Sequence, residues 1–205
     1  MTSFPPKDPS QDHLLAPGNA ALLLIDYQPV QFESLVSSTK QQIIEAVVAL
    51  AQTGVAFGLP IVLSTVNVSS GRNKDTVPRL KAVLEGITAL DRTQINAWED
   101  EQFNQAVKAT GRKKLIIAGL WTEACVTFPS IDALAEGYEV YVVADAVAGT
   151  SLVAHNAGLS RIKHAGGQLT TVVQLLCELQ RDWARTDTVG AYLKGMFETG
   201  AFPQL

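Results

Sequence analysis

Uninterrupted apolar segments alternate along this chain with segments that have the spacing of amphipathic helices. Residues 20–25 (AALLLI) and 113–120 (KKLIIAGL) lack the polar–apolar alternation of a half-exposed strand, which predicts strands covered on both faces. Helical segments of about 10 to 15 residues separate such strands, and this order is typical of right-handed βαβ units in a parallel sheet. The alternation therefore constrains the fold more than any other feature of the sequence.

The same alternation continues to about residue 184. Further strands are expected at residues 60–68, 91–98, 138–147 and 168–173, and helices at residues 38–58, 78–87, 99–111, 122–136, 151–167 and 174–184. Ser38 or Thr39 can cap the first of these helices, and Gly54 can end it. The predicted fold class is α/β, a three-layer α/β/α Rossmann-like fold with a mainly parallel sheet of order 3-2-1-4-5-6.

A chain of 205 residues is long enough to bury a full core as one domain. Residues 1–18, rich in Pro, Ser and Asp, are expected to form an N-terminal arm, and residues 19–185 the domain itself. Residues 186–205 form a tail that carries Tyr192 and Phe197 after the predicted sheet is complete. This tail either caps the core of its own subunit or contacts a neighbouring one.

Composition narrows the classes of partner. The net charge of −4, without a basic block, argues against nucleic acid, because no cluster of cations is available to neutralise phosphates. No apolar run approaches the roughly 20 residues of a membrane span, and no signal peptide is visible. Two cysteines far apart do not form a disulfide framework. We expect a cytoplasmic protein with a small-molecule substrate.

Two polar residues follow strands that the predicted order makes neighbours. Asp26 ends the first strand, and Cys125 lies just past the strand that ends at Gly119. Ligands of open parallel sheets bind beyond the carboxyl ends of the strands where the strand order reverses, so both side chains should face one crevice. Each also has a structural interpretation, since a lone cysteine is commonly a buried apolar side chain and an aspartate can cap a turn.

A thiol at this position has a chemical use. A helix N-terminus lowers the pKa of a cysteine, and nearby backbone amides can hold an oxyanion. Asp26 could accept the proton of Cys125 and pass it to a leaving group. Cys177, among leucines in "VQLLCELQ", is expected in the core. No histidine falls near either residue, and surface or packing roles are expected for all three, His13, His155 and His164.

From about residue 19 to residue 175 the chain resembles the isochorismatase-like cysteine hydrolases, a superfamily that includes nicotinamidases and N-carbamoyl amide hydrolases. The segment "LLLIDYQPVQF" is similar to the first-strand block of the family, with Asp26 at the family aspartate and Phe32 at the following aromatic residue. A longer segment, "AGLWTEACVTFPSIDALAEGYEVYVVADAVAG", resembles the nucleophile block. The resemblance implies a catalytic role for Cys125.

A third segment departs from the family pattern. The family usually has a lysine that completes an Asp/Lys/Cys triad, whereas the corresponding stretch "RTQINAW" has Arg92 in that place, with Asn96 and Trp98 after it. Arginine keeps the positive charge but is a wider, planar group. Three alternatives follow: Arg92 serves in the triad, Lys74 or Lys81 reaches the site, or the triad is weakened. We predict that Arg92 serves in the triad. The alternative role for Arg92 is a plain salt bridge at the surface.

The resemblance also implies the surroundings of the thiol. It implies a cis peptide between Leu120 and Trp121, which would turn the amides of Trp121 and Cys125 toward one oxyanion, with Thr122 orienting the turn. Candidate residues of the substrate pocket, named on position, are Phe32, Asn67, Trp98 and Trp121.

The resemblance and two missing motifs define the expected activity. Nicotinamidase-type members bind a metal through histidines after the second strand, but "STVNVSSGRNKD" contains none, so neither a metal nor a nicotinamidase is expected. The first strand is not followed by G-x-G-x-x-G, and no cofactor is expected. We therefore predict a metal-independent cysteine hydrolase of a small amide or related C–N bond, acting through a thioester.

The pattern is closest to the branch of hydrolases whose substrate is unresolved and whose members assemble as octamers, which implies a homo-oligomer. Two alternatives remain: an isochorismatase-type hydrolase that does not use the cysteine, and a non-catalytic assembly or binding protein on the same fold.

Overall fold

A computed structural model describes residues 7–202 and contains one six-stranded, entirely parallel sheet. The strands are β1 (Ala20–Ile25), β2 (Ile61–Val66), β3 (Leu90–Arg92), β4 (Lys114–Gly119), β5 (Glu139–Val143) and β6 (Gln168–Thr170). Their spatial order, β3-β2-β1-β4-β5-β6, confirms the predicted fold class and strand order. The central strands β1 and β4 are buried along their whole length, as continuous apolar runs indicate.

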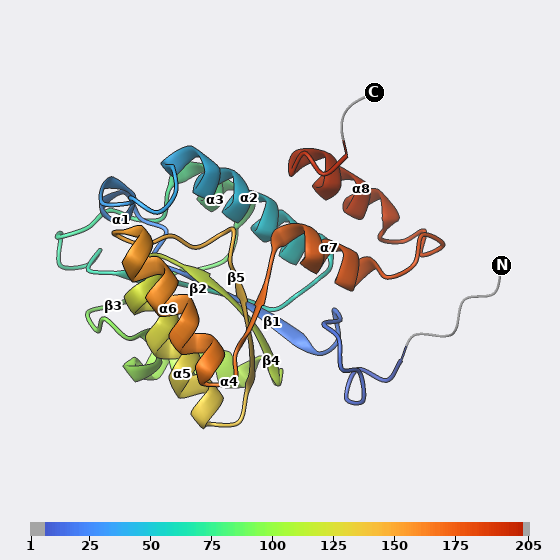
Figure 1. Ribbon diagram of the computed structural model, residues 1–205, viewed down its shortest axis with the longest axis horizontal. Helices are drawn as coiled ribbons and strands as arrows, with labels where there is room; N and C mark the ends of the chain where they lie inside the picture. Colours follow the sequence, from blue (N-terminus) through green and yellow to red (C-terminus); the bar gives the residue numbers. More distant parts are fainter. Residues whose placement is uncertain (1–6, 203–205) are drawn as a thin grey trace.

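Helices cover the sheet on both faces (Figure 1). The helical elements are α1 (Pro29–Glu33), α2 (Lys40–Ala56), α3 (Pro78–Val83), η1 (Ala97–Glu99), α4 (Glu101–Ala109), η2 (Thr122–Val126), α5 (Thr127–Ala135), α6 (Leu152–His164), α7 (Val172–Gln180) and α8 (Val189–Glu198). Helix α2 packs against α3, α7 and α8, whereas α5 packs against α6 and η1. None of the described helices is both long and apolar enough to cross a membrane.

The beginning of α2 follows from its sequence, but its end does not. Thr39 and Gln42 form a reciprocal capping box, as the Ser/Thr signal indicates. The prediction that Gly54 ends the helix is wrong, since α2 continues to Ala56. A Cβ at Gly54 would lie 2.7 Å from a methyl group of Leu22, so this glycine allows the helix to pack closely on β1.

The segment from Arg181 to Phe202 packs on the body of the same chain. Helix α8 contacts α2 and α7, and its residues Tyr192 and Met196 are buried (Figure 1). Phe197 and Trp183 remain exposed, with exposed fractions of 45% and 62%. The tail thus caps its own core and leaves an aromatic surface uncovered in the single chain.

The prediction that Cys177 lies in the core is wrong, because its side chain is exposed. The buried face of α7 is formed by Leu175, Leu176 and Leu179. Residues three and four apart share a helix face, whereas residue 177 is two positions from 175 and from 179 and points away from them. The leucines around it in the sequence therefore do not surround it in space.

In the N-terminal arm, residues 7–18 form turns without a helix or strand. Leu15 is fully buried, and Asp12 forms an ion pair with Arg181 beyond α7. The first six residues of the predicted arm lie outside the described residues, as do residues 203–205 of the predicted tail.

Candidate active site

Asp26 lies directly beyond the carboxyl end of β1 and is fully buried. Its φ of 60° is in the left-handed region, which is uncommon for residues other than glycine and is concentrated at functional sites. The backbone holds it there, because its amide donates to the Ser64 carbonyl at 3.0 Å and its carbonyl accepts from Gln28 at 2.8 Å. The carboxylate is thus fixed by the junction of β1 and β2.

A glycine lets the end of β4 come very close to the end of β1. Ile25 pairs with Gly119 in the sheet, and a Cβ at position 119 would lie 2.7 Å from the Ile25 carbonyl oxygen. A side chain here would push the strands apart. The close approach places the turn after β4 beside Asp26.

Cys125 belongs to that turn, which is a single π-helical turn ahead of α5 rather than the start of an ordinary helix. The peptide bond between Leu120 and Trp121, the position that the resemblance marks, is cis. The turn is anchored by the Thr122 amide, which donates to the Ala148 carbonyl at 2.9 Å. Cys125 is 7% exposed, and its thiol lies close enough to the Asp26 carboxylate for each group to shift the pKa of the other. The structure therefore places the two residues near each other beyond the neighbouring strands β1 and β4.

Arg92, the last residue of β3, completes this cluster. Its Nη1 donates to Asp26 Oδ1 at 2.6 Å and its Nη2 to Oδ2 at 2.8 Å, inside the protein. Further bonds to Ser64 Oγ and the Thr65 carbonyl at 3.1 Å, and to the Ile95 carbonyl at 3.2 Å, fix the planar group. Two-point pairing of this kind needs the planar fork of an arginine.

Neither lysine considered from the sequence reaches the cluster. The ammonium group of Lys81 forms an ion pair with Asp75 at the surface, and Lys74 is exposed. Arg92 is thus the cation that the structure places on Asp26, and its interpretation as a surface salt bridge is wrong because its side chain is 1% exposed.

Burial sets the protonation of the thiol. It raises the pKa of Cys125 to about 12, assisted by the negative charge of Asp26 and opposed by Arg92 and a backbone hydrogen bond from Trp121. The expectation that the helix N-terminus lowers this pKa is wrong for the free protein, since desolvation and the carboxylate outweigh it. Burial also raises the pKa of Asp26, while its bonds with Arg92 and Cys125 lower it. At neutral pH the resting cysteine is therefore a thiol.

The candidate pocket residues each make contacts of their own. Asn67 follows β2, and its amide donates to the Arg92 carbonyl at 2.9 Å. Phe32 belongs to α1 and is buried, with its ring centroid 6.3 Å from that of Tyr27. The Trp98 indole donates to Glu136 at 2.8 Å, beyond the far end of α5. The place of Trp98 in the substrate pocket stays a prediction.

Trp121 connects the nucleophile turn to α1. The Trp121 indole donates to the Gln31 carbonyl at 3.0 Å, and the Gln31 side chain accepts from Asn73 at 3.1 Å. These bonds join the segment after β1, the segment after β2 and the nucleophile turn at one edge of the sheet. Gln31 and Asn73 carry no sequence signal of their own, because the residues they join are far apart in the chain.

The sequence interpretation also missed the contacts behind the turn. Thr122 Oγ1 lies 2.8 Å from Nδ1 of His155, a residue assigned from sequence to the surface or to packing. Glu123 accepts bonds from the Thr150 amide at 2.9 Å and from its hydroxyl at 2.7 Å. These partners lie 27 and 33 residues away in sequence, beyond the range of any local pattern.

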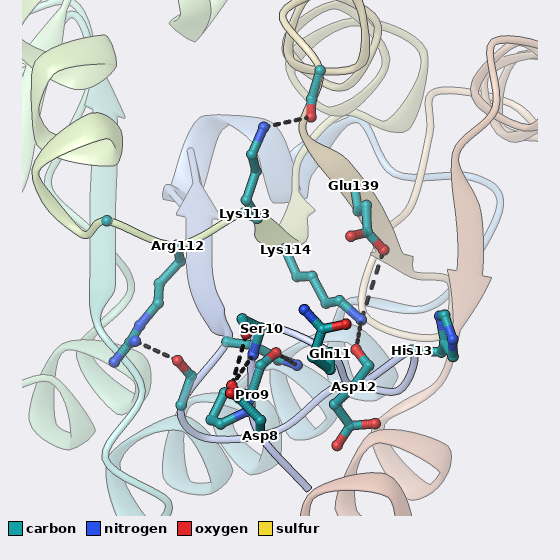
Figure 2. A pocket seen from close by; sticks show the side chains of 14 residues that line it. Asp8, Pro9, Ser10, Gln11, Asp12, His13, Arg112, Lys113, Lys114 and Glu139 are labelled. Atoms are coloured by element: carbon teal, nitrogen blue, oxygen red, sulfur yellow. Dashed lines mark hydrogen bonds and ion pairs between the residues drawn. The ribbon is translucent and has the colours of Figure 1, made fainter.

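A cavity of about 610 Å³ lies at the opposite edge of the sheet, where β1, β4 and β5 begin (Figure 2). Arg112, Lys113 and Lys114 line it, but their cationic groups are already paired. Lys114 donates to the Asp12 carbonyl at 2.7 Å and lies 3.7 Å from Glu139 Oε2, while Lys113 donates to the Gly137 carbonyl (Figure 2). This cavity is separate from Cys125. Elsewhere in residues 7–202, no three His, Cys, Asp or Glu side chains cluster in a way that could hold a metal ion.

Comparison with known proteins agrees with this geometry. The model of the isochorismatase domain matches residues 20–174. The Escherichia coli protein named "Probable hydrolase YcaC" is 40% identical over 173 residues, covering 84% of this chain and 82% of that protein.

Two solved structures share the fold over nearly their whole length. YcaC from Pseudomonas aeruginosa, solved with hexane-2,5-diol and covalent acrylamide, is 35% identical with a TM-score of 0.81, covering 92% of this chain and 98% of that one. The Escherichia coli YcaC structure, described as an octameric hydrolase of unknown specificity, is 34% identical with a TM-score of 0.82, covering 93% and 98%. The chain therefore belongs to the isochorismatase family of hydrolases.

Proposed function

We propose that the protein is a metal-independent cysteine hydrolase that cleaves a small amide or related C–N bond through a thioester. One observation carries the proposal: the Cys125 thiol lies within reach of a buried carboxylate, Asp26, which Arg92 holds at both oxygens. A nucleophile beside a proton acceptor that a third group orients is the arrangement that covalent hydrolysis requires.

In the acylation step, the Cys125 sulfur attacks the amide carbonyl carbon while its proton passes to Asp26. The carbonyl oxygen becomes an oxyanion, which the backbone amides of Trp121 and Cys125 stabilise in this proposal. As the C–N bond breaks, Asp26 donates the proton to the leaving nitrogen, so that an amine departs and a thioester remains. Because the resting cysteine is a thiol, attack and proton transfer are coupled.

In the deacylation step, water attacks the thioester carbonyl, and Asp26 accepts its proton. The collapse of the second oxyanion expels the sulfur, which recovers the proton from Asp26 and releases a carboxylic acid. Arg92 remains positively charged throughout, since a guanidinium does not lose its proton in proteins. Its role is to keep Asp26 oriented and to compensate its charge in a buried site.

The Pseudomonas aeruginosa relative supports this chemistry, because its solved structure contains covalent acrylamide. Acrylamide is a small primary amide with an electrophilic double bond. A protein of this fold and 35% identity thus accommodates a molecule of the proposed substrate class.

The test is a hydrolysis assay over a panel of small primary amides, secondary amides and carbamoyl compounds. We expect Cys125→Ser and Asp26→Asn to lose turnover, Cys177→Ser to retain it, and a chelator to leave it unchanged. Rapid quenching followed by mass spectrometry should detect an acyl group on Cys125. Full activity of Cys125→Ala would favour hydrolysis without the cysteine, and no turnover by the wild type across the panel would favour a non-catalytic role.

We infer in addition that the chain forms a homo-oligomer. The relative described as octameric matches 93% of this chain, and Trp183 and Phe197 leave an apolar surface exposed in the single subunit. Light scattering after gel filtration should give a mass several times 22.0 kDa, and a mass of one chain would contradict the inference.

A further inference from the structure

The nucleophile turn is also bonded to helix α6. Thr122 is fully buried, three residues before Cys125, and its Oγ1 lies 2.8 Å from Nδ1 of His155 in the first turn of α6. The Thr122 hydroxyl has no other hydrogen-bond partner among the described residues. Its orientation therefore depends on the imidazole.

A carboxylate makes a second connection at the same place. Glu123 Oε1 accepts both bonds from Thr150, while Oε2 is buried and without a hydrogen-bond partner within residues 7–202. A Cβ built on Gly149 would contact Glu123 Oε2 and would lie 3.1 Å from the amide and Cβ of His155. Glu123 and His155 thus approach each other across this glycine.

Helix α6 rests directly on the backbone of the turn because of a second glycine. A Cβ at Gly158 would lie 2.8 Å from Thr127 Oγ1, and 3.1 Å from both the Thr122 carbonyl oxygen and the Glu123 Cα. Thr127 Oγ1 itself donates to that carbonyl at 2.6 Å. With no space between helix and turn, a change at the imidazole must be taken up by the turn.

We propose that His155 is a positioning residue of the reaction, whose neutral imidazole accepts the Thr122 hydroxyl proton and so holds the turn that carries Cys125. The inference rests on the proposed function and adds a residue that does not touch the substrate. A neutral imidazole has one acceptor nitrogen, whereas both nitrogens of the charged form are donors. Protonation therefore forces the Thr122 hydroxyl to rotate and reverses the bond.

The surroundings of His155 favour the neutral form. Burial lowers the pKa of His155 from its ordinary value, and the Glu123 carboxylate opposes this shift. Helix α6 also packs against α5 and β6; β6 (Gln168–Thr170) has no charged residue, and the charged residue of α5, Asp132, accepts a bond from Asn96. Arg161, one and a half turns further along α6, lies over the Phe128 ring at 5.8 Å.

The test uses the reactivity of Cys125, measured in the intact protein with Cys177→Ser to remove the exposed thiol. The rate constant for capture of Cys125 by acrylamide and by iodoacetamide is determined by peptide mass spectrometry from about pH 4.5 to about pH 8, the range in which histidines titrate. Protonation of Asp26 also slows capture in acid. Comparison of His155→Asn with the wild type therefore isolates the part of the pH dependence that comes from the imidazole. Asparagine offers an acceptor oxygen near the Nδ1 position but does not titrate.

We expect His155→Asn to capture the reagents at the wild-type rate at neutral pH. In a plot of this rate constant against pH, the variant should lack one of the two falls that the wild type shows in acid. His155→Leu and Thr122→Val should each slow capture by about tenfold or more at neutral pH, and the double variant should be no slower than either. Thermal unfolding identifies variants that fail to fold. Independently of any variant, nitrogen NMR of wild-type His155 should show Nδ1 without a proton at neutral pH.

Two results would overturn the inference: unchanged rates and profiles in all His155 variants, or a protonated Nδ1 at neutral pH. If Cys125 reacts, Asp26→Asn abolishes that reaction and the His155 variants match the wild type, only this inference fails. If wild-type Cys125 reacts with neither reagent at any pH, the proposed function fails, and the inference fails with it.

Discussion

Arg92 and Asp26 form a two-point ion pair inside the protein, with both carboxylate oxygens bonded, at 2.6 Å and 2.8 Å, and neither side chain more than 1% exposed. Removing both groups from water is costly, and the pair is retained only because each compensates the other. The same carboxylate lies within reach of Cys125. The stability of the fold and the proposed chemistry therefore depend on the same contact.

Breaking this pair should destabilise the protein strongly. Arg92→Met leaves Asp26 buried without a cation, and we expect the free energy of unfolding to fall by about 3–5 kcal/mol in urea titrations. Asp26→Asn combined with Arg92→Met should cost less than the sum of the single changes. The exposed pair of Lys81 and Asp75 is the matched control, and Lys81→Met should cost less than about 1 kcal/mol. Equal losses for Arg92→Met and Lys81→Met would contradict the prediction.

Replacing Arg92 by lysine separates charge from geometry. A lysine ammonium is a single point of charge and can bond only one Asp26 oxygen well, so Arg92→Lys should lose about 1–2 kcal/mol of stability. Because the charge remains, capture of Cys125 by acrylamide should persist, whereas Arg92→Met should slow it by about 100-fold. Capture rates and urea midpoints measured on the same preparations test both parts. A lysine variant as unreactive as the methionine variant would show that two-point pairing, not charge, is required.

The two cysteines should react in an order opposite to their proposed importance. Cys177 is exposed, whereas Cys125 is buried with its pKa raised to about 12, so iodoacetamide at neutral pH should modify Cys177 first. Around neutral pH the Cys125 rate should be low and nearly level, because Asp26 accepts the proton as the thiol reacts, and it should rise in strong base as the free thiolate forms toward that pKa. Cys177→Ser and Cys125→Ser assign each adduct. A Cys125 rate at neutral pH that exceeds the rate of Cys177 would instead indicate a preformed thiolate.

A methyl group between α6 and the nucleophile turn should damage the site. Gly158→Ala places a Cβ 2.8 Å from Thr127 Oγ1, so α6 must move, and we expect a loss of about 1–3 kcal/mol with slower capture of Cys125. Gly190→Ala is the control, because that helical glycine has nothing within 4 Å of the built Cβ. Alanine there should leave reactivity unchanged and raise stability by up to about 1 kcal/mol. Similar effects of the two substitutions on reactivity would show that α6 does not hold the turn.

The sequence by itself determined the architecture and the residues at the centre of the candidate site. The apolar segments at residues 20–25 and 114–119 could only be strands covered on both faces, and βαβ connections place the carboxyl ends of parallel strands together. Asp26 and Cys125 were therefore predicted to meet from their positions after β1 and β4, and Arg92 was predicted from its place in the third segment of the resemblance.

Only the tertiary structure decided how these groups behave. The pKa of Cys125 depends on how completely its surroundings exclude water, which no local pattern specifies, so burial reverses the shift expected from a helix N-terminus. The bond between Thr122 and His155 and the approach of α6 at Gly158 join segments that are about thirty residues apart. Cys177 was misplaced for a related reason, since the direction of its side chain is set by the packing of α7. Strand order follows from patterns repeated along the chain, whereas protonation and contact geometry follow from distances that exist only after the chain has packed.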